Sequence, residues 1–219
     1  MKAALENALD LADKSLEDSR IVVVGAGAAG IAVSNFLVEA GAKNILPVDS
    51  SGILRTDDEN IYKAELAKNS LSSEESGGLS DALENADAVI GLSVGGLISQ
   101  EMVKSMADDP IVFALANPDP EILPDEAREA GALITATGRS DFNNQVNNSL
   151  AFPGVFRGAL DVQASEINED MKLAASEAIR EFVDPEIEKI VPETLDKELA
   201  MEIADMVKEA AKSSGVNRK

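Results

Sequence analysis

The 219-residue sequence contains no cysteine, no histidine and no tryptophan, and it has a single tyrosine. Without cysteine the chain can form neither disulfides nor thiolate zinc sites. Without histidine it has no Ser-His-Asp triad, no imidazole metal ligand and no histidine acid–base catalyst. Aromatic residues make up only 3% of the chain, so its core must be built from Ala, Val, Leu and Ile.

Positive charge is also scarce, because 19 basic residues face 40 acidic ones and the net charge is −21. Such a surface repels phosphate backbones and anionic lipids, so we expect neither nucleic acid nor a membrane as a partner. No apolar run reaches the ~18 residues of a membrane span, and no secretory segment follows Met1, which predicts a cytoplasmic protein. The acidic excess extends along the whole chain and favours a halophilic protein, because salt screens self-repulsion. An ordinary acidic protein is the alternative.

Short apolar, β-branched runs alternate with segments of helical periodicity along the first two thirds of the chain. Strands are predicted at 20–24, 44–48, 86–92, 111–115 and 132–135, and helices at 30–40, 61–67, 79–84, 98–106 and 124–130. This alternation predicts an α/β fold of Rossmann type, with a doubly wound, mostly parallel sheet and helices on both faces. Pro47 is expected near the end of its strand, because it lacks a backbone N–H.

One domain is expected over residues 1–219. It would begin with a helix at 3–18 and continue with the Rossmann core at 20–137. Amide-rich loops at 138–162 and a helical C-terminal tail at 163–219 would follow. The tail is expected to pack back on the sheet.

The strand at 20–24 runs directly into a GxGxxG sequence, GAGAAG at 25–30, which opens a helix. This strand–turn–helix context is what the dinucleotide-binding fingerprint requires. Gly25 would permit the tight turn, Gly27 the close approach of a pyrophosphate, and Gly30 the contact between helix and strand. Unpaired N–H groups at the helix start would bind the phosphates. A tight turn that binds nothing is the alternative.

Asp49 ends the second strand, 24 residues beyond Gly25. This separation is close to the roughly 20 residues typical of an acid that binds the adenosine ribose. Its carboxylate would repel the 2′-phosphate of NADP, which favours NAD as the cofactor and makes NADP less favoured. Arg55 weakens this inference, because it could meet a phosphate.

Small residues and amides lie where other strands end. The segment GLSVGG at 91–96, which includes Ser93, and the pair Asn117-Pro118 belong to the carboxyl edge of the sheet, where ligands bind. Asn147 and Asn148 follow the amide-rich loop. Side-chain amides can orient a nicotinamide carboxamide or a substrate carboxylate, but they cannot act as general bases. The alternatives are turn formation for Asn117 and helix capping for Asn147 and Asn148.

We assign no catalytic residue and no metal ligand from the residues alone. Tyr62 is expected on an exposed helix rather than in a site. Asp87, Asp141 and Asp161 could ligate a divalent cation, but no close acidic pair stands at the carboxyl edge.

Several separate blocks of the sequence resemble the NAD-binding half of the malic enzymes, especially the shorter bacterial and archaeal forms. The blocks are LEDSRIVVVGAGAAGIA (16–32), VDSSGI (48–53), YKAELA (62–67), ADAVIGLSVGG (86–96), FALANPDPEI (113–122), ATGRSDFNNQVNN (136–148) and LAFPGVFRGALDV (150–162). The likeness runs from about residue 3 to about residue 212. Two departures are Val94-Gly95-Gly96, where a Pro-Gly pair is usual, and Phe142-Asn143, where Tyr-Pro is common.

Malic enzymes oxidise malate with NAD(P) and a divalent cation and then decarboxylate the product to pyruvate, so the resemblance implies an oxidoreductase of malate metabolism. It implies that Asp49 binds the adenosine ribose, that Asn117 lies beside the nicotinamide, and that Asn148, with Asn147, contacts the nicotinamide end and malate. The residues it implies for the pyrophosphate are Gly25, Ala26, Gly27, Ala28, Ala29, Gly30 and Ile31.

The family's catalytic tyrosine and lysine and its acidic metal ligands lie upstream, in a separate substrate domain. The resemblance therefore implies half an enzyme, which binds NAD but is inactive alone. Malate, pyruvate and Mg²⁺ or Mn²⁺ would bind only together with the absent half. A stand-alone NAD-binding or regulatory module is the alternative, and another two-domain dehydrogenase, such as an amino-acid dehydrogenase, is a third hypothesis. A homodimer is compatible with the sequence.

Overall fold

The computed structural model describes residues 1–70, 75–194 and 196–218. Residues 71–74 of the predicted core, and 195 and 219 of the predicted tail, lie outside the described residues. The chain divides into two compact units, Ala8–Gln145 and a second one that joins Met1–Asn7 to Val146–Lys219. Helix α1 (Lys2–Leu11) contributes residues to both. The single domain expected over 1–219 stays a prediction.

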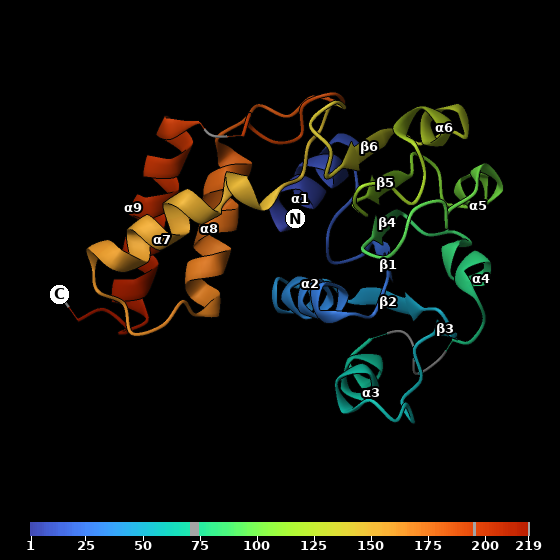
Figure 1. Cartoon of the computed structure of the whole chain (residues 1–219), viewed down its shortest axis with the longest axis horizontal. Helices are drawn as coiled ribbons and strands as arrows, with labels where there is room; N and C mark the ends of the chain where they lie inside the picture. Colours follow the sequence, from blue (N-terminus) through green and yellow to red (C-terminus); the bar gives the residue numbers. More distant parts are fainter. Residues whose placement is uncertain (71–74, 195, 219) are drawn as a thin grey trace. The chain divides into compact units, whose positions relative to one another are not determined.

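The unit Ala8–Gln145 is built on a six-stranded sheet in the order β3-β2-β1-β4-β5-β6 (Figure 1). The strands are β1 (Arg20–Val24), β2 (Asn44–Asp49), β3 (Gly52–Ile53), β4 (Ala88–Gly91), β5 (Ile111–Ala114) and β6 (Ile134–Thr137). Every pairing is parallel except that of β2 with the short β3. This sheet confirms the predicted doubly wound α/β fold, and it adds β3, which the sequence analysis did not predict.

Helices connect the parallel strands and cover the sheet. They are α2 (Ala28–Glu39), α3 (Ile61–Lys68), α4 (Leu79–Leu83), α5 (Gln100–Lys104) and α6 (Pro124–Glu129). Helices α4, α5 and α6 lie along one side of the strands in Figure 1, and α2 packs against β1 and β2. The residues of β4, β5 and β6 are buried without alternation, as expected for parallel strands covered on both faces.

The helix predicted at 3–18 is shorter than expected, because α1 ends at Leu11. Asp13 adopts φ +56°, a left-handed conformation that cannot continue a right-handed helix. A polar turn follows, in which the Ser15 hydroxyl accepts from the N–H of Asp18 at 3.2 Å and the Ser19 hydroxyl donates to the Ser15 carbonyl at 2.6 Å.

Pro47 lies inside β2, and not near its end as predicted. The neighbouring residue Val48 directs its carbonyl to β1, where it accepts from the N–H of Gly25 at 2.8 Å. Backbone groups alternate in direction along a strand, and the Pro47 carbonyl accepts instead from Leu54 at 3.0 Å. The missing N–H of Pro47 therefore faces away from β1, and the main parallel ladder loses no bond.

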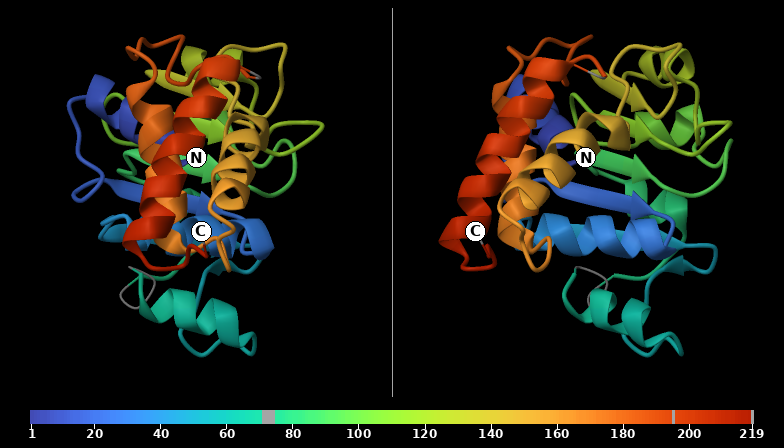
Figure 2. Two further views of the ribbon diagram at one scale, coloured as in Figure 1. Left: turned by 90° about the vertical axis from the view of Figure 1, so that its left-hand side faces the viewer. Right: turned by 60° about the vertical axis from the view of Figure 1, so that its left-hand side comes forward.

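The second unit contains the helices α7 (Phe152–Asp161), α8 (Glu169–Glu181) and α9 (Lys197–Ser213), which lie against one another (Figure 2), and the short 3₁₀ helix η2 (Asn148–Leu150). Helices α8 and α9 confirm the helical tail expected at 163–219, whereas α7 lies within the segment 138–162 that was expected as amide-rich loops. Gly154 and Gly158, one turn apart on α7, allow close approach of α9. A Cβ at Gly154 would lie 2.5 Å from the Cβ of Ile203, and one at Gly158 would lie 2.6 Å from the carbonyl oxygen of Ala204.

Among the described residues, no helix is both long enough and apolar enough to cross a bilayer.

Candidate dinucleotide site

The turn between β1 and α2 needs two of its three glycines for its own backbone. Gly25 adopts φ +106°, and a Cβ there would lie 2.6 Å from the carbonyl oxygen of Leu92. A Cβ at Gly30 would lie 1.7 Å from the carbonyl oxygen of Gly25. Gly27 differs from both, because it is exposed and a Cβ there would meet no atom within 4 Å. The surface over Gly27 is therefore open to a ligand.

The start of α2 offers unused hydrogen-bond donors at the same place. Gly27 is the N-cap residue and supplies no side-chain cap, and the first turn of the helix carries no acidic residue. Within the described ranges, no protein group accepts a hydrogen bond from the N–H of Ala28 or Ala29, both of which are exposed. These donors and the positive end of the helix dipole suit a phosphate.

Asp49 stands at the carboxyl end of β2, beside β1 and its turn. Its Oδ1 accepts from the N–H of Ser51 at 2.7 Å, and its Oδ2 accepts from the ammonium of Lys63 on α3. Burial alone would raise the pKa of the Asp49 carboxyl, but the bonds from Lys63 and Ser51 together hold this pKa below its ordinary value. The hydrogen bond from Asp49 in turn raises the pKa of Lys63. Asp49 is thus an ionised acceptor whose charge Lys63 partly offsets.

Ser93 and Asn117 follow neighbouring parallel strands, β4 and β5, at the same carboxyl edge as Gly25. Both residues are exposed. Within the part of the chain that the structure describes, the side chain of Asn117 makes no hydrogen bond, so its amide is free to meet a ligand. Asn117 also lies in the bend after β5, before Pro118, so the turn-forming alternative stays open beside the binding one.

Asn147 and Asn148 belong to the second compact unit. Asn147 is the N-cap of η2, and its side chain accepts from the N–H of Ser149 at 2.9 Å. The capping alternative is therefore what the structure shows for Asn147. Asn148 is the first residue of η2 and is exposed. Contact of either amide with a cofactor stays a prediction.

Two polar residues at the carboxyl edge were missing from the sequence-based site. One is Lys63, the partner of Asp49. The other is Glu121, which is fully buried and accepts hydrogen bonds from the backbone of both loops that follow β4 and β5. The available signal for Glu121 was an acidic residue at the end of the block FALANPDPEI. The pairing of Lys63 with Asp49 depends on how the β2–α3 segment folds, which the block YKAELA alone does not indicate.

The candidate metal ligands are held by cations in separate ion pairs. Asp87 contacts Lys14 at 2.8 Å, Asp141 contacts Arg139 at 2.7 Å and Asp161 contacts Arg157 at 2.8 Å. Among the described residues, no group of three or more acidic side chains is placed to hold a metal ion. Tyr62 is 63% exposed on α3, as expected for a surface residue.

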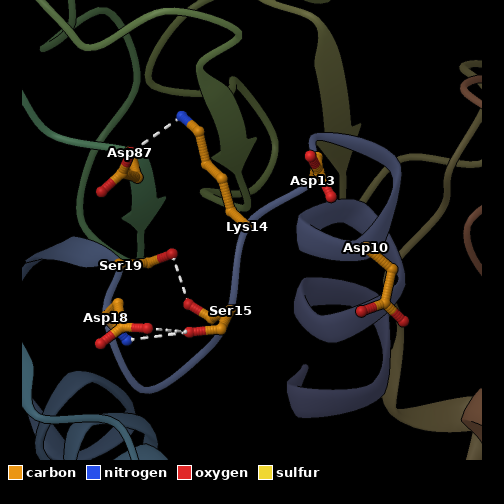
Figure 3. A pocket seen from close by; sticks show the side chains of 7 residues that line it. All are labelled: Asp10, Asp13, Lys14, Ser15, Asp18, Ser19 and Asp87. Carbon is orange, nitrogen blue, oxygen red and sulfur yellow. Dashed lines mark hydrogen bonds and ion pairs between the residues drawn. The ribbon is translucent and has the colours of Figure 1, made fainter.

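A cavity of about 640 Å³ opens at the opposite, amino edge of the sheet, where Ser19 precedes β1 and Asp87 precedes β4 (Figure 3). It is lined by Asp10, Asp13, Lys14, Ser15, Asp18, Ser19 and Asp87. Lys14 also donates to the carbonyl of Asp108 at 2.6 Å. Ser15, Asp18 and Ser19 bind one another, and Lys14 binds Asp87, whereas Figure 3 shows no side-chain bond from Asp10 or Asp13 to the other lining residues. The cavity lies at the opposite end of the strands from the glycine turn.

In this sheet the strand order reverses at β1, which pairs with β2 on one side and with β4 on the other. Ligands of open α/β sheets bind at the carboxyl edge beside such a reversal, which is where the glycine turn and the N-terminus of α2 lie. Fold and site together define a dinucleotide-binding domain. The family model for the NAD-binding domain of malic enzymes matches residues 1–212. The chain belongs to the malic enzyme family, as its NAD-binding domain.

Individual relatives agree with this assignment. The chain is 49% identical over 222 residues to the bifunctional malic/malolactic enzyme of Bacillus subtilis, and this alignment covers 99% of this chain and 54% of that protein. It is 48% identical to the NAD-dependent malic enzyme of Geobacillus stearothermophilus, over 99% of this chain and 46% of that protein. The crystal structure of the malic enzyme from Pyrococcus horikoshii superimposes with a TM-score of 0.95 at 41% identity, over 100% of this chain and 53% of that one.

The chain spans about half the length of the curated relatives it matches. These relatives include enzymes named as NAD-dependent and others named as NADP-dependent. The match to solved structures of malic enzymes confirms both the predicted Rossmann-type fold and the predicted family.

Proposed function

We propose that the chain binds NAD at the Gly25–Gly30 turn and positions the nicotinamide at the ends of β4 and β5 for hydride transfer from malate. The proposal rests above all on Gly27. The protein fills the space beside Gly25 and Gly30 with its own backbone but leaves Gly27 open, next to the unused N–H groups of α2. An open glycine beside free donors fits a pyrophosphate, which needs close backbone approach and hydrogen-bond donors.

The residues of this chain bind and orient, and we assign none of them a proton transfer. The backbone from Gly25 to Ile31 would hold the pyrophosphate, and Asp49 would accept from the adenosine ribose. Ser93 and Asn117 would face the nicotinamide ribose and carboxamide. When NAD is bound, its nicotinamide ring supplies the hydride acceptor. Asn147 and Asn148 are proposed as further contacts of the nicotinamide end.

A preference for NAD over NADP is proposed from the charge of Asp49, because a carboxylate repels a 2′-phosphate. Lys63 opposes this preference, since its ammonium offsets part of that charge. Arg55 contributes little, because its side chain is 77% exposed and already binds Asp57 through two bonds of 2.8 Å. The partly buried Asp49 carboxylate should therefore decide the preference.

The activity of a whole malic enzyme is a further proposal for this chain. Its relatives are about twice as long, and the family resemblance places the catalytic tyrosine and lysine and the ligands of Mg²⁺ or Mn²⁺ in the other half. We propose that malate and pyruvate bind only together with that half, and that the isolated chain is inactive. A cytoplasmic location, adaptation to high salt and homodimer formation are retained as proposals from the composition and the family.

Calorimetric titration of the purified chain with NAD, and with NADP in parallel, tests the proposal. We expect one site per chain and tighter binding of NAD, in molar KCl and in dilute buffer. Absence of binding to a chain shown to be folded by circular dichroism would contradict the proposed site. Substantial malate-dependent NADH formation by the isolated chain would contradict its predicted inactivity.

A further inference from the structure

A buried carboxylate joins the two loops at the carboxyl edge of the sheet. Glu121 is 0% exposed, and its two oxygens accept from different loops. Oε1 accepts from the N–H of Ser93 after β4 at 2.8 Å, and Oε2 accepts from the N–H of Ala116 after β5 at 3.1 Å. Among the described residues, no lysine or arginine forms an ion pair with Glu121. The carboxylate is therefore held by loop backbone alone.

The loop backbones meet closely at this carboxylate. The N–H of Ile98 donates to the main-chain carbonyl of Glu121 at 3.0 Å. A Cβ on Gly91 would lie 2.3 Å from the carboxyl carbon of Glu121, and a Cβ on Gly95 would lie 2.7 Å from the Cβ of Asp119. The absence of side chains at Gly91 and Gly95 is thus a condition for the two loops to meet.

The same junction reaches the glycine turn. A Cβ on Gly25 would lie 2.6 Å from the carbonyl oxygen of Leu92 and 3.2 Å from the Cβ of Ser93. Glu121 binds the N–H of Ser93, and its other oxygen binds the residue just before Asn117. The carboxylate therefore joins the two loops proposed for the nicotinamide, and the first of these loops lies against the turn proposed for the pyrophosphate.

We propose that Glu121 is a positioning residue for the nicotinamide half of the cofactor. It fixes the separation of Ser93 and Asn117 at the sheet edge without touching the cofactor itself. A carboxylate suits this task because both of its oxygens accept, whereas an amide would present an NH₂ group to one of the two N–H donors. The inference rests on the proposed function, since it assumes that the nicotinamide binds at these loops.

The test compares Glu121→Gln with Glu126→Gln in the purified chain. Glu126 is a matched control, because its carboxylate also accepts a backbone N–H, that of Leu123 at 3.3 Å, but it is exposed on α6 and serves neither loop. NAD and ADP, which lacks both the nicotinamide and its ribose, are titrated against both variants. We expect Glu121→Gln to weaken NAD binding about tenfold, because one buried N–H loses its acceptor. ADP binding should change less than about threefold, and Glu126→Gln should match the wild type for both ligands.

The outcomes separate the two proposals. If the wild-type chain binds neither ligand, the proposed function fails. If the wild type binds NAD and Glu121→Gln weakens NAD and ADP equally, or weakens neither, the positioning role of Glu121 is wrong. If Glu121→Gln does not fold, hydrogen exchange of the backbone N–H groups of Ser93 and Ala116 in the wild type decides. Exchange slowed further by NAD but not by ADP supports the role, and equal slowing by both ligands overturns it.

Discussion

The glycines of the β1–α2 turn and those of helix α7 have similar spacing in the sequence, but they differ in what occupies the space beside them. Both sets are closely spaced, and both allow one backbone to approach another. In α7 the protein fills the space beside Gly154 and Gly158 with helix α9. In the turn it fills the space beside Gly25 and Gly30, but not beside Gly27.

This difference separates a packing glycine from a binding glycine. A glycine whose missing Cβ is replaced by protein atoms serves the fold, because any side chain there would clash. Gly41 also has open space beside it, but its φ of +106° requires a glycine. Gly27 has open space and an ordinary φ of −81°, so neither an internal contact nor its own backbone requires a glycine there. This combination is the argument for a ligand over Gly27.

The largest effect in this comparison is expected where the space is filled. Gly30→Ala should lower the free energy of unfolding by about 3 kcal/mol, because its Cβ would meet the backbone of Gly25. Gly158→Ala should lower it by about 2 kcal/mol, because the clash with α9 exceeds the gain of about 1 kcal/mol in helix propensity. Urea unfolding followed by circular dichroism measures both values. A free energy of unfolding equal to that of the wild type in either variant would show that occupied space beside a glycine does not predict the cost of adding a Cβ.

The opposite pattern is expected for Gly27→Ala. Its Cβ would point into open space and its φ of −81° is ordinary, so the free energy of unfolding should change by less than about 0.5 kcal/mol. Affinity for NAD should fall about tenfold, or about 1.4 kcal/mol, because the methyl group would occupy the place of the pyrophosphate. Calorimetry with NAD gives this value.

Gly41→Ala serves as the control for Gly27→Ala, because the space beside Gly41 is also open but the residue lies after α2, away from the carboxyl edge. Its φ of +106° predicts some loss of stability but unchanged NAD affinity. Wild-type affinity in Gly27→Ala would mean that the open space over the turn is not the pyrophosphate site.

Sequence patterns predicted the parallel strands and the glycine turn because both depend on local chemistry. A β-branched run such as Ile21–Val24 is buried on both faces, and a GxGxxG sequence constrains its own backbone. The same reasoning placed Asp49 correctly at the end of its strand. The short strand β3 was missed because two residues carry no periodicity.

Longer-range contacts explain the other errors. Pro47 was expected near a strand end because the rule for proline concerns a lost N–H, but the direction in which that N–H would point depends on the neighbouring strand. Glu121 was overlooked because its role comes from two loops that only the sheet brings together. Lys63 is 14 residues from Asp49, and their contact depends on where α3 packs.

The smallest expected effect on stability concerns the ion pair of Asp49 and Lys63, in which the ammonium partly offsets the charge of the carboxylate. Lys63→Met should lower the free energy of unfolding at neutral pH by less than about 1 kcal/mol, since partly exposed ion pairs contribute little. The pKa of Asp49 is held below its ordinary value of 3.8 in the folded chain, so the stabilisation is present above that pH and is lost as the pH falls through the lowered pKa. The difference between wild type and variant, measured by urea unfolding from pH 7 down to about pH 2, should therefore persist to about pH 4 and shrink below the ordinary pKa of 3.8.

The affinities of Lys63→Met for NADP and NAD test the role of the Asp49–Lys63 pair in cofactor preference. Without Lys63 the full charge of Asp49 faces the adenosine ribose, so Lys63→Met should bind NADP less well than the wild type while NAD affinity changes little. Arg55→Met is the matched control, because Arg55 is an exposed cation of the same segment that binds Asp57 instead. If Arg55→Met lowers NADP affinity and Lys63→Met does not, then Arg55 meets the 2′-phosphate and the carboxylate of Asp49 is not what sets the preference.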